Sequence, residues 1–149
     1  MAKGLIFGVT NAIITMLALI TGMYASKVNK VGVVAAILAI LIATPLSDAY
    51  SMYMSEKSNK PENAFNVGKQ AFISQFTLQL GFFLIIILTP DLFTGLILSY
   101  IFGLISIVSY AFTQDSPREE LFMNLSGIAF IIIITYYSDL LVHKYYKKN

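Results

Sequence analysis

The chain has 149 residues, of which 57% are apolar, and its mean hydropathy is +0.74; this is typical of a single-domain integral membrane protein. The net charge is only +2, and the lysines form no block that would bind nucleic acid. Cysteine is absent and His143 is the single histidine, which excludes disulfides, thiolate metal sites, catalytic triads and multi-histidine sites.

Five apolar segments follow one another along the chain, each about 20 residues long and therefore long enough to cross a hydrocarbon core of about 30 Å. Short segments rich in charged and turn-forming residues separate them. The sequence thus predicts an all-α integral membrane protein with five transmembrane helices. The predicted spans are residues 5–25, 31–54, 70–89, 92–112 and 121–142, within one domain of residues 1–149, and residues 55–69 are predicted to form a short polar loop.

The first span follows Lys3 directly, as the apolar region of a cleaved signal peptide would. Its length exceeds that of such a region, and Met23 stands where a cleavage site requires a small residue. We therefore interpret it as a retained membrane span.

The second span carries acidic residues inside or beside its apolar run. In a helix Asp48, Met52 and Glu56 are spaced i, i+4 and i+8, so they lie above one another on a single face. A carboxylate near the bilayer centre costs about 2.5 to 3.5 kcal/mol even on the lenient insertion scale. We therefore predict a functional role for this face, with Asp48, Met52 and Glu56 as metal ligands. Pro45 in the same span frees a backbone carbonyl, which must face protein, water or an ion.

Amide and hydroxyl side chains also lie within the first and third spans. Asn11 and Thr15 share a face of the first span, and Gln75 and Gln79 lie in the third. We predict Asn11 as a further residue of the metal site, and Thr15, Gln75 and Gln79, together with Ser51 of the second span, as residues of the ion or proton pathway. Such groups line a water-filled path for ions or protons in some membrane proteins, and in others they only join helices by hydrogen bonds. Both interpretations remain open from the residues alone.

A carboxylate next to a thioether, without histidine or cysteine, favours borderline divalent metals, ferrous iron first and manganese second. One chain offers too few ligands for a complete shell, so we predict a two-fold homodimer with the first and second spans at the interface. Carboxylates held close together in an emptied site would take up a proton, which provides a route to exchange of metal for protons.

Two motifs resemble those of a known family. Gly4-Leu-Ile-Phe-Gly-Val-Thr-Asn11 is similar to the first-span pattern Gly-Leu-Ile-Phe-Gly-Val-x-Asp of the vacuolar iron transporter (VIT) family. Ser51-Met-Tyr-Met-Ser-Glu56 resembles the second-span pattern Ser-Met-x-x-Gly-Glu of that family. Weaker similarity in Gly81–Pro90 and around Ser116-Pro-Arg extends the resemblance over nearly the whole chain.

This resemblance implies a homodimeric exporter that moves ferrous iron and related divalent metals out of the cytosol in exchange for protons, with a cytosolic N-terminus and an external C-terminus. By position it makes Met52 and Glu56 metal-binding residues. Asn11 stands where the family has an aspartate. The long acidic insertion of the family is also missing, because Glu62 is the only acidic residue in the segment 57–69. The chain is thus a short form that lacks the cytosolic metal-binding insertion.

A prokaryotic plasma membrane is the expected location, because no targeting signal is visible. Lys and Arg residues are divided equally between the two sides, so charge does not orient the chain. We expect neither enzyme activity nor a cofactor, since the spans hold no nucleophile and base pair. The alternative function is a non-transporting membrane scaffold or assembly subunit whose polar residues join helices.

Overall fold

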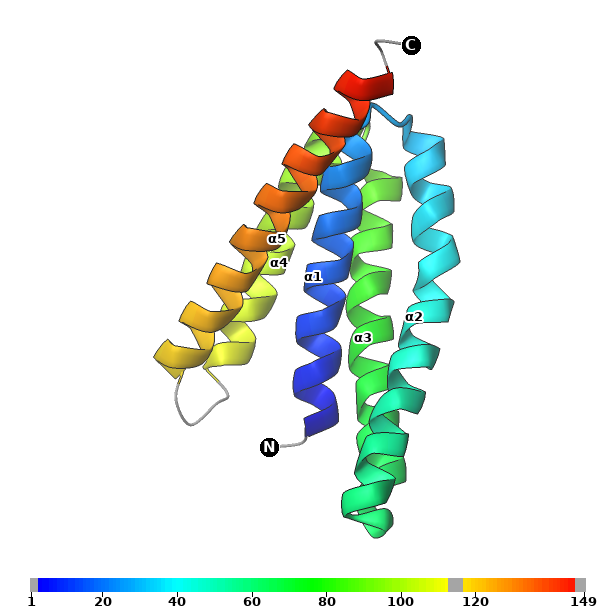
Figure 1. The fold of residues 1–149 in the computed structure, drawn as a ribbon, viewed down its shortest axis with the longest axis vertical. Coiled ribbons are helices and arrows are strands. Elements are labelled where there is room, and N and C mark those ends of the chain that lie inside the picture. Colours follow the sequence, from blue (N-terminus) through cyan, green and yellow to red (C-terminus); the bar gives the residue numbers. More distant parts are fainter. Residues whose placement is uncertain (1–2, 113–116, 147–149) are drawn as a thin grey trace.

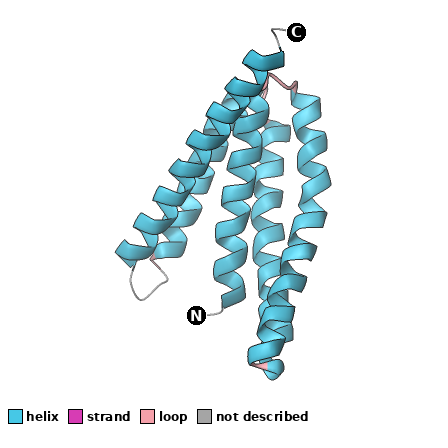
Figure 2. Ribbon diagram, in the orientation of Figure 1, coloured by secondary structure: helices cyan, strands magenta, loops and turns pink. Residues whose placement is uncertain are grey.

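The computed structural model describes residues 3–112 and 117–146, and these residues form helices joined by short turns (Figures 1 and 2). No strand occurs among them. The helices are α1 (Lys3–Ala25), α2 (Lys30–Asn59), the one-turn 3-10 helix η1 (Pro61–Asn63), α3 (Ala64–Leu88), α4 (Leu92–Ala111) and α5 (Pro117–Tyr146).

Four of these helical segments are long and apolar enough to cross a membrane, judged by length and composition. They are α1, α2, the continuous segment Pro61–Leu88 and α4. The fifth helix, α5, has 30 residues, and Asn124–Ser138 is the apolar stretch found within its described part. The all-helical fold is confirmed for the described residues, with four helical segments suited to membrane spans, and a fifth crossing by α5 stays a prediction.

The helices run alternately up and down the bundle. Figure 1 shows α1 beginning at the lower end and α5 ending at the upper end, as five long helices that alternate in direction require. Helix α3 packs against both α1 and α2, and α5 packs along α1. Figure 1 also shows the lower ends of α4 and α5 leaning away from α1.

Side chains at the helix ends determine where α2 and α4 begin. Asn29 accepts a hydrogen bond from the Gly32 amide at 2.8 Å and caps α2. Asp91 accepts bonds from the Thr94 amide at 2.9 Å and the Thr94 hydroxyl at 2.7 Å, and it caps α4. These bonds to the charged form hold the pKa of Asp91 below its usual value. Each cap satisfies backbone donors that the first turn of a helix leaves free.

The C-terminus of α3 is covered by a lysine from the start of α2. The ammonium of Lys30 donates to the carbonyl of Ile87 at 3.0 Å and also to the carbonyl of Thr89. These carbonyls lie at the negative end of the helix dipole, where a cation is stabilising. The contact ties the start of α2 to the end of α3.

The predicted loop over residues 55–69 is wrong. Helix α2 continues to Asn59 and α3 begins at Ala64, so the hairpin projects below the start of α1 (Figure 1). Packing explains the difference, because Ala64, Val67 and Gly68 are buried. A Cβ atom on Gly68 would lie 2.9 Å from the Ala49 carbonyl oxygen of α2. Polar residues on the outer face do not prevent a helix from forming when its inner face is packed.

Glycines allow α1 and α3 to approach closely. A Cβ atom on Gly8 would lie 2.5 Å from the Ala71 carbonyl oxygen and would overlap the Ser74 hydroxyl. A Cβ atom on Gly4 would overlap the Val67 carbonyl. The two glycines, one helical turn apart, therefore form a small-xxx-small contact of the kind that brings membrane helices together.

The bundle has a polar half and an apolar half. Toward the turn between α1 and α2, the core is a cluster of buried apolar side chains. Its fully buried members include Met16, Ile20, Val33, Ile37, Phe82 and Ile86. The buried polar residues Glu56, Gln75 and Gln79 lie toward the opposite end and belong to the candidate site. Thr21, whose hydroxyl bonds that of Tyr100, and Thr89 are buried polar residues near the end with the turn.

Candidate functional site

The inner face of α2 is a regular stripe that changes from apolar to polar. Buried side chains recur every four residues at Val33, Ile37, Leu41 and Pro45. The same face continues through residues 48, 52 and 56, as their helical spacing predicts. The stripe therefore lies against α1 and α3, the helices that pack on α2.

Asp48 joins three helices. Its Oδ2 atom accepts a hydrogen bond from Nε2 of Gln75 on α3 at 2.7 Å and another from Nδ2 of Asn11 on α1. The carboxylate is half-buried, and it points into the bundle toward two amide donors. Donors of this kind stabilise a carboxylate inside a membrane protein.

A second polar pair lies one helical turn further into the bundle. Nε2 of Gln79 donates to the Thr44 hydroxyl at 2.9 Å, and that hydroxyl donates in turn to the Ile40 carbonyl at 2.9 Å. Gln79 is fully buried, with no exposed surface. The pair Thr44 and Gln79 repeats the pair Asp48 and Gln75 because α2 and α3 are antiparallel, so four residues back on one helix correspond to four residues forward on the other.

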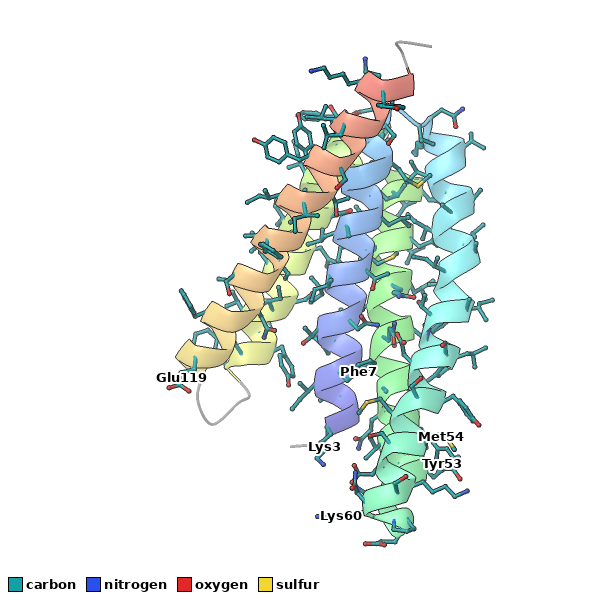
Figure 3. All side chains as sticks on the ribbon, in the orientation of Figure 1. Lys3, Phe7, Tyr53, Met54, Lys60 and Glu119 are labelled. Atoms are coloured by element: carbon teal, nitrogen blue, oxygen red, sulfur yellow. The ribbon has the colours of Figure 1, made fainter. Side chains whose placement is uncertain are left out.

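Glu56 lies at the other end of the polar stripe, two turns from Asp48. Only 5% of its surface is exposed, and its Oε2 atom lies 3.5 Å from the ammonium of Lys3 on α1. The Lys3 side chain itself is 68% exposed. Figure 3 shows Lys3 at the lower end of α1, on the side of the lower ends of α2 and α3.

Gln75 carries an oxygen without a partner. The residue is fully buried, and its Oε1 atom has no hydrogen bond within the described part of the chain, although its Nε2 atom donates to Asp48. A buried carbonyl oxygen left unpaired costs about 1 to 3 kcal/mol. Such an atom beside a carboxylate is suited to accept a cation or a water molecule.

The other predicted residues differ in how close they lie to Asp48. Met52 is half-buried on the same face as Asp48. Thr15 lines a groove with Ala18 and does not join the hydrogen bonds of Asp48. Ser51 is exposed and bonds the Ser47 carbonyl of its own helix at 2.9 Å, so the structure does not bring it to the site.

A groove follows α1 between α2 and α5. Its lower part, of about 430 Å³, is lined by Lys3, Phe7, Thr10, Asn11 and Asn124 among others. Its upper part, of about 630 Å³, is lined by residues of α1, Val28 and Ile40 beside or on α2, and Thr135 of α5. Both parts share Ile14, so the open face of α1 is continuous and reaches the side chain that bonds Asp48.

The arrangement does not form a complete metal shell within one chain. Among the side chains that the structure describes, no group of three or more His, Cys, Asp or Glu residues comes together. Asp48 and Glu56 are two helical turns apart, about 12 Å along the axis. The two carboxylates therefore belong to separate sites on one face of α2 and cannot bind the same ion.

Two residues of the site, Lys3 and Thr44, are not predicted from the sequence. The pairing of Lys3 with Glu56 follows from the pairing of Asn11 with Asp48, because α1 and α2 are antiparallel. Lys3 lies eight residues before Asn11, and Glu56 lies eight residues after Asp48. Comparison of the chain with protein-family models, with curated proteins and with solved structures found no match.

Proposed function

We propose that this protein transports divalent transition metals across a membrane, with ferrous iron as the first candidate and manganese as the second. The observation that carries the proposal is the carboxylate of Asp48, which points into the bundle and accepts bonds from Asn11 and Gln75 on two other helices. A carboxylate in this position is costly to insert, whereas helix joining needs only amides and hydroxyls.

The side chains around Asp48 offer a mixed set of donors. The carboxylate and the free Oε1 atom of Gln75 are hard oxygen ligands, and Met52 one turn away adds a soft thioether. With two amide donors already on one oxygen, the second carboxylate oxygen, Oδ1, has no bond from either of them. Water molecules would complete the shell, and modest affinity suits a transporter, because an ion held too firmly does not leave.

The departure from the vacuolar iron transporter pattern at position 11 fits the geometry. An aspartate there would place its carboxylate within hydrogen-bond reach of Asp48, where two like charges repel. Asn11 instead donates to Asp48. In this proposal the acid of the path has moved from the first helix to the second.

The polar and apolar halves of the bundle support a state that is open to the cytosol and closed on the outer side. The column from Glu56 through Asp48 to Gln79 and Thr44 ends at the apolar cluster near Phe82 and Ile86. With the N-terminus in the cytosol, as the family resemblance implies, the polar half faces the cytosol and the apolar cluster closes the outer side. Export then requires the apolar cluster to open, with protons returning on the carboxylates.

A second copy of the chain completes the proposal. The groove along α1 presents Thr10, Thr15, Ala18 and Gly22 between larger apolar side chains such as Ile14 and Leu19. Small residues allow close helix contact in a membrane, and a two-fold axis along this groove would double every ligand. This is the homodimer with α1 and α2 at its interface.

Flux through proteoliposomes tests the transport function. Vesicles with an internal dye quenched by divalent metal should show uptake of ferrous iron or manganese, and an imposed proton gradient should change the rate. The Asp48→Asn variant keeps the shape but removes the charge, and should lower flux at least about tenfold, the effect of about 1.4 kcal/mol. Asp91→Asn, a change at a helix cap where Asn is equally suitable, should transport normally.

The scaffold hypothesis makes the opposite prediction for the same experiment. The amide that Asp48→Asn introduces can still bond neighbouring side chains, so a protein that uses this position only to join helices would show no metal flux with either sequence. Equal flux in the wild type and Asp48→Asn would remove Asp48 from the mechanism.

A further inference from the structure

The ion pair between Lys3 and Glu56 lies on the path described above but has no role in it so far. We propose that Lys3 is a tethered counter-ion whose ammonium occupies the cargo position at Glu56 and must be displaced before a divalent metal binds there. This inference rests on the proposed transport function and assigns that function a residue that sets its affinity.

The two partners differ sharply in exposure. Glu56 has 5% of its surface exposed, so its carboxylate is largely shielded from water. Lys3 is 68% exposed, and its ammonium reaches the carboxylate at 3.5 Å from the end of a flexible stem. Removing the lysine from Glu56 is therefore easy, whereas leaving the buried carboxylate without any cation is strongly unfavourable. These conditions favour exchange of one cation for another.

A lysine and a metal ion exclude each other at this position. The ammonium has three donors and no lone pair, so it satisfies a carboxylate but cannot share a metal shell. A metal must take the same oxygen, and the repulsion between the two cations then drives Lys3 outward into water. The chain thus lowers its own affinity for metal at the first carboxylate, which favours release as well as binding.

The position of Lys3 supports a role at the entrance. The residue lines the lower end of the groove along α1, together with Asn11, the donor to Asp48. Figure 3 shows it at the free lower end of α1. A displaced Lys3 side chain therefore remains at the mouth of the route toward Asp48.

Manganese binding to the purified full chain in detergent tests the proposal, with free Mn²⁺ followed by its electron paramagnetic resonance signal. Lys3→Met removes the competing charge and should tighten binding about fivefold, the factor expected for one partly exposed ion pair. The matched control is Lys57→Met, because Lys57 adjoins Glu56 in sequence but its ammonium lies 5.5 Å from the centre of the Tyr53 ring. This control should leave the affinity unchanged.

A charge-conserving variant covers the case in which Lys3→Met folds poorly. Lys3→Arg retains the pair and should bind Mn²⁺ no more tightly than the wild type, because arginine holds a carboxylate at least as well. Tighter binding by both Lys3→Met and Lys57→Met would indicate a general effect of surface charge and would overturn the proposal.

The outcomes separate this proposal from the transport function itself. If the wild type binds Mn²⁺ and loses affinity with Glu56→Gln, but Lys3→Met leaves the affinity unchanged, Lys3 is a structural clasp and only this proposal falls. If neither the wild type nor any variant binds Mn²⁺, the transport function falls and this proposal with it. Tightening that occurs in Lys3→Met and disappears in Lys3→Met combined with Glu56→Gln would support it.

Discussion

Asp48 shows how one side chain can hold an entire site together. It is bonded to Asn11 and Gln75, so the two helices that pack beside it each contribute one amide to the same oxygen atom. The carboxylate supplies the charge, and the amides determine its orientation. Thr44 and Gln79 repeat this arrangement one turn deeper, with a hydroxyl in place of the carboxylate.

The neutral pair Thr44 and Gln79 gives a test of stability. Thr44→Val removes the hydroxyl with little change in shape and leaves the buried Gln79 amide without its acceptor. We expect the free energy of unfolding to fall by about 1 to 3 kcal/mol, the cost of an unpaired buried polar group. Denaturant unfolding in mild detergent measures it.

Ser51 provides the matched control for this substitution. Its hydroxyl is exposed and bonds its own helix at 2.9 Å. Ser51→Ala should therefore change the free energy of unfolding by no more than about 0.5 kcal/mol. An equal loss in both variants would mean that the bond between Thr44 and Gln79 adds nothing beyond a general loss of hydroxyl groups.

The contact between α1 and α3 decides whether the polar groups meet at all. Gly4 and Gly8 bring the backbone of α1 against the carbonyl groups of Val67 and Ala71. Asn11 lies less than one turn beyond Gly8, so its amide reaches Asp48 only while this crossing stays close. The glycines of the first motif are therefore explained by helix packing, and they act on the site through distance.

We expect Gly8→Ala to separate α1 from α3. Its Cβ atom would lie 2.5 Å from the Ala71 carbonyl oxygen, and the resulting strain should cost about 1 to 3 kcal/mol of unfolding free energy. Metal flux should fall with it because Asn11 moves away from Asp48. Thermal unfolding and the dye assay, run on the same preparation, measure both effects.

Gly127 on α5 offers the corresponding control. A Cβ atom there would meet nothing within 4 Å. Gly127→Ala should leave flux unchanged and should stabilise the helix slightly, by about 0.5 to 1 kcal/mol. If Gly8→Ala is as stable and as active as Gly127→Ala, the close crossing of α1 and α3 is not required.

The other helices of the bundle surround α1 only in part. Helices α2 and α3 cover one side of α1, and α4 and α5 cover another, but the groove between α2 and α5 leaves α1 open along its length. The small and polar side chains within this mainly apolar groove allow another helix to pack closely against α1. The proposed dimer would close it.

The absence of cysteine from the sequence makes the dimer easy to test. A single cysteine in place of Ala18, in the upper part of the groove, should form a disulfide with its copy across a two-fold axis after mild oxidation in the membrane. The product is a band of twice the monomer mass on a non-reducing gel.

Leu104→Cys is the control for the cross-link. Leu104 lies on α4 with 47% of its surface exposed, on a face outside the groove. It should yield monomer under the same conditions. Monomer from both variants, or equal cross-linking of both, would argue against an interface along α1.

The sequence by itself determined the helices, because apolar runs of membrane-spanning length must satisfy their backbone groups internally and can do so only as helices or closed barrels. It also determined the face shared by Asp48, Met52 and Glu56, since helical spacing fixes which side chains align. The predicted helix boundaries around residues 55–69 were wrong, because the buried contacts of Ala64 and Gly68 with α2 are not visible in the composition.

Only the tertiary structure decided which helices this face meets. The spacing along α2 does not predict that Asp48 contacts Gln75 or that Glu56 contacts Lys3. Both contacts depend on the offset between neighbouring antiparallel helices. That offset is fixed by the glycine contacts of α1 with α3 and of α3 with α2. Partners separated by tens of residues are brought together by packing, and packing is a property of the folded bundle.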